Sequence, residues 1–171
     1  PKLRKPRQNR ETSLLYSEPK MKDNIYRVAE LDMKIQFAES TTNNEQLIES
    51  FEPFRVSALK GSILFHLTVD DNTRPYPKEK RERIRNFDTG SGHTIVDKLD
   101  DGGYQFIIRD IYDADCALVI ANADFSECRC ALNGNMNMRR FGLNNTLMLI
   151  YAFASCPYDT LMLHASLVRQ N

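Results

Sequence analysis

The sequence predicts a β-rich α+β fold in which an antiparallel meander packs against a buried helix. Residues 94–132 contain strand-length apolar segments separated by turn residues. Residues 143–154 form an apolar helical segment that another layer must cover. The length of 171 residues, with 42% hydrophobic and 27% charged residues, is that of an ordinary folded protein that can build its core without disulfides or a metal.

Three short strands are expected before the meander. Residues 25–37 alternate between apolar and polar side chains, which predicts two strands joined by a turn at residues 30–32. Residues 62–69 alternate in the same way and predict a third strand. The apolar side chains on one face of that strand are Ile63, Phe65, Leu67 and Val69.

A helix is expected between the second and third strands. Thr42 and Glu45 have the spacing of a capping box, in which each side chain meets an orphan backbone donor of the other residue. Pro53 is expected to end this helix. Residues 70–92, with two prolines, mixed charge and a Gly-rich end, are predicted to be a loop.

The meander is expected to have four strands. Residues 100–103, with the sequence DDGG, predict a turn between strands at 95–99 and 104–109. Two further strands are expected at 116–121 and 128–132. Aspartates are frequent in this region, and their positions at turns favour a role in backbone hydrogen bonding over metal binding.

The helix after the meander is expected to begin only after a polar break. Residues 133–137 are polar and predict a break, and Asn144 or Asn145 can cap a helix that runs to about Ala154. Pro157 ends it.

Residues 161–168 predict a final strand that is apolar on both faces, as a central strand is. If this strand lacks a neighbour, it favours pairing with another chain. We therefore expect self-association or poor solubility.

Charge and hydropathy exclude several classes of partner. The formal net charge is zero, which argues against a dedicated nucleic-acid binder. Residues 1–20 carry a net charge of +4 and predict a disordered basic tail, with a targeting arm as the alternative. The longest apolar run, residues 147–154, is too short to cross a bilayer. We expect a cytoplasmic protein without a membrane partner, whose cysteines are reduced.

Three groups of residues were considered as ligand sites. Cys116, Cys128 and Cys130 could bind zinc, but a C-x-x-C pair is absent and buried cysteine is the favoured interpretation, so no metal site is predicted. Residues 88–92 could hold an anion with their backbone N–H groups, but a hairpin loop is favoured. The basic stretch 74–85 is interpreted as a solvated surface, with a phosphate-facing patch as the alternative.

The histidines differ in their surroundings. His66 is expected to face the polar side of its strand, and His93 to lie in a turn. His164 interrupts the apolar segment 161–168. It is either a core imidazole paired with a backbone group or a functional side chain.

The segment 158–168, YDTLMLHASLV, contains a Leu-His-Ala-Ser-x-Val pattern. It resembles the segment that precedes the P-loop in HPr kinase/phosphorylase-like proteins, especially the kinase-like branch of Bacteroidetes. The catalytic core of that family is similar to phosphoenolpyruvate carboxykinase. The resemblance implies a β-rich N-terminal domain at residues 21–140 and the opening of a kinase-like core at residues 141–171.

The same resemblance implies that ATP and Mg²⁺ are the cofactors of the full-length family. It places His164 near the reacting phosphate as a catalytic residue, where an imidazole assists proton transfer. No glycine in the chain is followed by lysine, so the G-x-x-x-x-G-K-[ST] loop is absent and no cofactor is expected to bind this chain. The chain is expected to be inactive by itself.

Two functions therefore remain open at this stage. The first is the N-terminal, non-catalytic part of an ATP-dependent HPr-type serine kinase, with a protein substrate or a second copy of the chain as its partner. The alternative is a non-enzymatic β-rich binding or interaction module.

Overall fold

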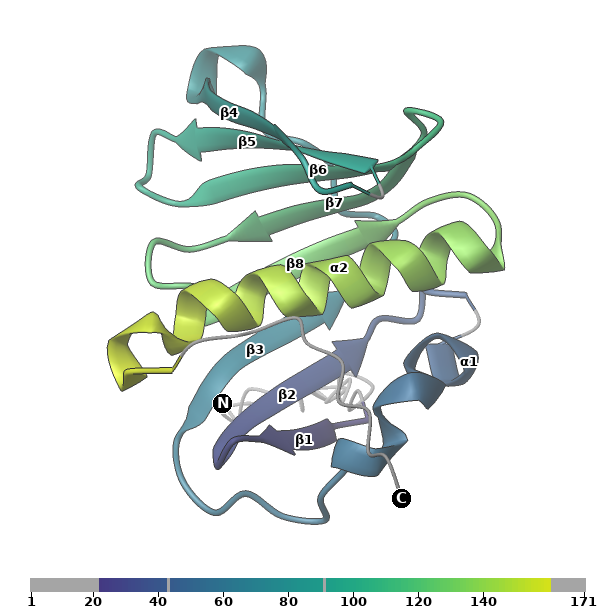
Figure 1. Ribbon diagram of the computed structural model, residues 1–171, viewed down its shortest axis with the longest axis vertical. Helices are drawn as coiled ribbons and strands as arrows, with labels where there is room; N and C mark the ends of the chain where they lie inside the picture. Colours follow the sequence, from purple (N-terminus) through teal and green to yellow (C-terminus); the bar gives the residue numbers. More distant parts are fainter. Residues whose placement is uncertain (1–21, 43, 91, 161–171) are drawn as a thin grey trace, which may run out of the picture.

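The computed structural model describes residues 22–42, 44–90 and 92–160. These residues form an eight-stranded sheet with the order β1-β2-β3-β8-β7-β6-β5-β4 and with helices on one face (Figure 1). The α+β, β-rich class expected from the sequence is confirmed. The strands are β1 (Asn24–Val28), β2 (Leu31–Phe37), β3 (Ile63–Val69), β4 (Arg81–Asp88), β5 (Gly92–Leu99), β6 (Tyr104–Asp110), β7 (Asp115–Ala121) and β8 (Glu127–Leu132).

The antiparallel meander is confirmed and runs from β5 to β8. The turn at residues 100–103 closes with a hydrogen bond from the Leu99 amide to the Gly103 carbonyl at 3.0 Å. Gly102 adopts φ +90°, a left-handed conformation that glycine tolerates without strain. The turn chemistry of this segment is therefore sufficient to set the β5–β6 hairpin.

Strand β4 corrects the expectation that residues 70–92 form a loop. Its sequence, RERIRNFD, lacks the apolar alternation that marks a half-buried strand, and all of its residues except Arg81 are exposed. The segment is a strand because its backbone pairs antiparallel with β5 at the edge of the sheet. Charged side chains and a bulge between Arg83 and Arg85 discourage pairing of this edge with another chain.

The N-terminal strands join the meander through parallel pairing. Strands β1 and β2 form the expected hairpin, with its turn at Ala29 and Glu30. A crossover then carries the chain to β3, which lies parallel to β2 on one side and to β8 on the other. Three adjacent strands therefore run in the same direction at the centre of a mostly antiparallel sheet.

The crossover contains α1 (Asn44–Ile48) and the 3-10 helix η1 (Glu49–Phe54). Pro53 lies inside η1 rather than ending the helical segment. The α-helical segment already ends at Ile48, and the 3-10 helix that follows ends at Phe54, one residue after Pro53.

Helix α2 (Met136–Ser155) begins before the Asn144 or Asn145 start that the sequence suggested. The Asn135 side chain caps it by accepting hydrogen bonds from the amides of Asn137 and Met138 at 3.0 and 3.1 Å. The polar segment 133–137 is thus the cap itself rather than a break. The helix ends at Ser155, and a 3-10 turn (Cys156–Tyr158) follows with Pro157 inside it, close to the expected end.

Helix α2 packs across β3, β8, β7 and β6, which confirms the expected contact between the meander and this helix (Figure 1). Leu143 and Ile150 are fully buried against the sheet. At Gly142 an added Cβ would lie 2.7 Å from the Cys116 carbonyl oxygen, so glycine permits the close approach of α2 to β7. The helix is buried on one side, since Met148 and Phe153 are about half exposed.

The helix-covered face forms the hydrophobic core. Phe65, Leu67 and Val69 of β3 are fully buried there, as is Val119 of β7. Their even spacing in β3 is the alternation seen in the sequence. The proposed domain boundary between residues 140 and 141 falls within α2.

Candidate functional site

The face of the sheet opposite α2, here called the open face, carries the polar side chains. A pocket of about 680 Å³ lies on it, between strands β2, β3, β7 and β8 and the segment 70–76 that follows β3. This volume is in the range of small-molecule sites. The pocket, here called the open-face pocket, includes His66, Thr68, Arg74, Asp101, Glu127 and Arg129 among its lining residues.

The pairing register places the floor of this pocket in a single row that crosses the sheet. Each residue of the row is the cross-strand partner of the next, from β2 to β5. Side chains of one row project on the same face because alternate residues of a strand point to opposite sides. The row consists of Gln36, Thr68, Arg129, Ile120, Gln105 and Asp97.

One end of the row is closed by residues 70–80, here called the strap. The Gln105 side-chain oxygen accepts a hydrogen bond from the Tyr76 amide at 2.7 Å, and Gln105 donates to Asp97 at 3.1 Å. Arg81 donates to the Tyr76 carbonyl at 2.9 Å and also pairs with Asp97. The strap is therefore fixed to the sheet by its backbone through the buried Gln105 and the partly buried Arg81.

Asp97 is the centre of that network. It is 1% exposed and pairs with both Arg81 and Arg83. Burial would raise the pKa of Asp97, but the hydrogen bonds from Arg83 and Arg81 outweigh it and hold this pKa below its usual range. The carboxylate is thus ionised and fully paired, which assigns it a structural role.

Arg129, in the same row, has the opposite environment. Its side chain is exposed on the pocket floor. In the part of the chain that the structure describes, it forms no hydrogen bond and no ion pair within 4 Å. Its row neighbours, Thr68 and Ile120, are uncharged. The pKa of Asp70 is lowered by hydrogen bonds from Ser40 and the Asn72 amide and also by the charge of Arg129. The guanidinium is therefore open to an acceptor from outside the protein.

Beside Arg129, a chain of hydrogen bonds orients His66. The Gln36 amide nitrogen donates to Asp23 at 2.5 Å, so its oxygen faces His66 Nε2 at 2.6 Å and accepts a hydrogen bond from it. His66 Nδ1 then lies 3.4 Å from Glu127 Oε2. Burial would raise the pKa of Asp23, but the hydrogen bonds from Lys34 and Gln36 hold it below its usual range.

This orientation turns His66 Nδ1 toward Glu127. An imidazole nitrogen can donate to a carboxylate when it carries a proton and can accept a hydrogen bond when it does not. The expectation that His66 faces the polar side of its strand is confirmed, but its network could not be read from the sequence.

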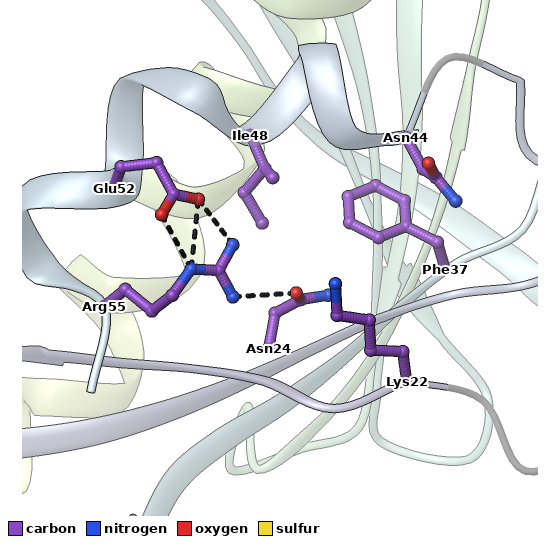
Figure 2. A pocket seen from close by; sticks show the side chains of 7 residues that line it. All are labelled: Lys22, Asn24, Phe37, Asn44, Ile48, Glu52 and Arg55. Carbon is purple, nitrogen blue, oxygen red and sulfur yellow. Dashed lines mark hydrogen bonds and ion pairs between the residues drawn. The ribbon is translucent and has the colours of Figure 1, made fainter. Parts of the chain in front are cut away.

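A second pocket, of about 430 Å³, lies between β1, the end of β2 and the α1–η1 segment (Figure 2). Its Arg55 is already engaged, because it donates to Glu52 at 2.8 Å and to Asn24 at 2.9 Å. The guanidinium carbon also lies 4.9 Å from the centre of the Tyr26 ring. The lining consists of Lys22, Asn24, Phe37, Asn44, Ile48, Glu52 and Arg55.

The arrangement in Figure 2 is best explained as structural. The Val56 amide donates to the Ile25 carbonyl at 3.0 Å, so the Arg55 region covers the outer edge of β1. Arg55 and Glu52 neutralise each other by a two-pronged contact. The Arg55 guanidinium therefore already has a carboxylate partner, whereas Arg129 in the open-face pocket has no ion-pair partner among the described residues.

The cysteines considered for zinc are part of the packing. Cys128 and Cys130 point into the helix-covered core, and burial raises the pKa of each thiol to about 12. Cys116 precedes Ala117, which faces the core. Because successive residues of a strand point to opposite faces, Cys116 points away from that core. Within residues 22–42, 44–90 and 92–160, no group of three or more His, Cys, Asp or Glu could hold a metal ion.

Other residues selected from the sequence have structural positions. The segment 88–92 joins the paired strands β4 and β5, and the Gly90 amide donates to Asp88 at 2.6 Å. Ser91 lies outside the described residues. His93 lies in β5 rather than in a turn and contacts Asp113 at 3.2 Å. In the basic stretch, Arg81 and Arg83 pair with Asp97. His164 and the segment 161–168 lie outside the described residues.

The pattern of the single strands does not show that Gln36, Asp97 and Arg129 share one row. Each is a polar residue at an alternate position of a strand, which indicates a polar face but not its neighbours across the sheet. Gln36 joins the row only because β3 inserts in parallel between β2 and β8.

No family model, curated protein or solved structure matches this chain. Within the described part of the chain, no helix has both the length and the apolarity to span a membrane.

Proposed function

We propose that this chain is the N-terminal, non-catalytic part of an ATP-dependent HPr-type serine kinase. The observation that carries the proposal is the Leu-His-Ala-Ser-x-Val pattern at residues 163–168, which resembles the segment before the P-loop of that family. The pattern begins at Leu163, a few residues after α2 and the 3-10 turn Cys156–Tyr158, and α2 packs on the sheet. A cytoplasmic location belongs to the same proposal, because that compartment supplies ATP.

In this proposal the described sheet is a support, and phosphoryl transfer takes place elsewhere. The chain contains no glycine followed by lysine and so lacks the loop that would cradle the phosphates. His164 would contribute a hydrogen bond or proton transfer to the reacting phosphate once that loop and Mg²⁺ are supplied. ATP and Mg²⁺ are therefore cofactors of the proposed whole protein.

The reading frame that follows Asn171 tests the proposal directly. We expect Gly-Lys-Ser or Gly-Lys-Thr within about 20 residues, at the start of a helix. Calorimetry gives the second test: this chain should not bind Mg-ATP with micromolar affinity, whereas the protein extended through that loop should. Micromolar binding by the present chain, or a frame without the loop, contradicts the proposal.

His164 has its own test in the extended protein. His164→Ala should lower phosphoryl transfer by about 10²–10⁴-fold while Mg-ATP affinity stays the same. His93→Gln is the matched control, because His93 lies in β5 and contacts Asp113. Equal activity of the His164 variant and the control would remove the catalytic role.

The second candidate is a non-enzymatic binding module, and the unmatched Arg129 in the open-face pocket favours it. Its partner would be a ligand or a protein, including a second copy of this chain. A stop codon after Asn171, together with no Mg-ATP binding, would select this function over the kinase. Light scattering on the purified chain would show whether self-association is part of it.

A further inference from the structure

The open-face pocket has two opposite charges close together on β8. Glu127 and Arg129 are two residues apart on this strand, so they project on the same face about 7 Å apart along the chain. The Glu127 carboxylate is 70% exposed and lies 3.4 Å from His66 Nδ1, its one side-chain contact among the described residues. The Arg129 guanidinium forms no hydrogen bond or ion pair with a described residue, and its charge adds to the hydrogen bonds from Ser40 and Asn72 that lower the pKa of Asp70. The pocket thus presents a carboxylate at one point and a guanidinium at the other.

Other charged groups of the pocket are occupied by the protein. Asp70 accepts hydrogen bonds from Ser40 at 2.6 Å and from the Asn72 amide at 2.9 Å. Asp101 accepts from the Gly103 amide and from the Tyr76 hydroxyl, and Arg74 donates to strap carbonyls at 2.9 and 3.1 Å. These groups therefore shape the wall, and the unmatched pair on β8 remains for a ligand.

Charge complementarity then restricts the class of ligand. A simple anion would match Arg129 but would meet the carboxylates of Glu127 and Asp101. A simple cation would match Glu127 but would meet the guanidiniums of Arg129 and Arg74. A small molecule with an ammonium group and a carboxylate satisfies both points. Its ammonium would donate to Glu127, and its carboxylate would accept the two-pronged bond that arginine forms.

We propose that the open-face pocket binds a small zwitterion, either a free amino acid or the two ends of a very short peptide. The Gln36–Asp23 chain orients the site in advance, because it fixes the His66 ring beside Glu127. Pre-orientation of this kind increases affinity because less freedom is lost on binding.

Calorimetry or amide chemical-shift titration of this chain tests the proposal with four probes. These are pools of the common L-amino acids, the dipeptide Ala-Ala, N-acetylated amino acids that lack the ammonium, and amines that lack the carboxylate. We expect saturable binding of an amino acid or of the dipeptide, and the comparison of these two distinguishes the source of the zwitterion. We expect at least 10-fold weaker binding of the acetylated and amine probes.

Two variants and one control assign the binding to β8. Arg129→Gln should weaken zwitterion binding by more than 10-fold, and Glu127→Gln should weaken it while leaving the acetylated probes unaffected. Arg85→Gln is the matched control, since Arg85 is exposed on β4 and makes no hydrogen bond or ion pair with any described residue. Thermal unfolding at an unchanged midpoint shows that each variant is folded.

The proposal is overturned if no amino acid or dipeptide binds saturably at millimolar concentration. It is also overturned if Arg129→Gln binds as the wild type does, or if the acetylated probes bind as tightly as the free zwitterions. None of these results bears on the proposed kinase function, because that function rests on residues 163–168 and this site on β8.

Discussion

The two faces of the sheet are built from the same strands but held by different forces. On the helix-covered face, β3 contributes three fully buried apolar side chains to a core closed by α2. On the open face, the same strand contributes His66 and Thr68 to a polar pocket. Alternation along one strand therefore separates a stabilising layer from a layer that is available for recognition.

The largest effect is expected from a cavity in the covered face. Phe65→Ala removes a fully buried ring and should lower the free energy of unfolding by about 3–5 kcal/mol. Urea denaturation measures it. Phe87→Ala is the control, because Phe87 is 43% exposed on β4 and its loss should change stability by about 0.5 kcal/mol or less. An equal loss of unfolding free energy in Phe65→Ala and Phe87→Ala would contradict the difference in packing between the covered face and β4.

The next effect concerns the open face. Asp97→Ala leaves Arg81 partly buried without its partner and should cost about 2–3 kcal/mol, less than a fully buried pair because Arg83 is half exposed. Hydrogen exchange should also become faster in the strap, since Gln105 and Arg81 lose their common anchor. Glu82→Ala is the control, as Glu82 is exposed and unpaired among the described residues. An unchanged strap would show that it is held by other contacts.

A third change tests how closely the covered face is packed. Gly142→Ala gains about 1 kcal/mol in helix propensity, but its methyl group would lie 2.7 Å from the Cys116 carbonyl oxygen. We expect a net loss of about 1–2 kcal/mol, because α2 must move away from β7. Thermal or urea unfolding measures the loss. A more stable variant would indicate that α2 has room to shift.

The smallest effect is the acid dependence of the open face. The pKa of Asp97 is lower in the folded protein than in the unfolded chain, so its pairing adds stability above the unfolded value of about 3.9. This contribution is lost as the pH falls below about 4 and through the folded pKa. In Asp97→Asn the unfolding free energy should therefore fall less steeply between pH 5 and pH 2. An identical slope in the wild type and the variant would exclude Asp97 as a source of acid sensitivity.

Local chemistry explains why parts of the fold could be predicted. The alternation in residues 62–69 and the DDGG turn at residues 100–103 specify a strand and a hairpin through neighbours in sequence. Where the local pattern was misleading, a distant contact decided the outcome. Strand β4 exists because β5 pairs with its backbone, and its charged sequence has no apolar face of its own.

Local patterns in the sequence specify the β-rich meander, the packed helix near residue 150 and the apolar face of β3. The spacing of apolar residues and the residues at turns carry that information because they act over a few positions of the chain. The insertion of β3 between β2 and β8 is visible only in the folded structure. That insertion brings His66 beside Glu127 and Thr68 beside Arg129. Such neighbours depend on long-range backbone pairing, which the pattern of any single strand does not encode.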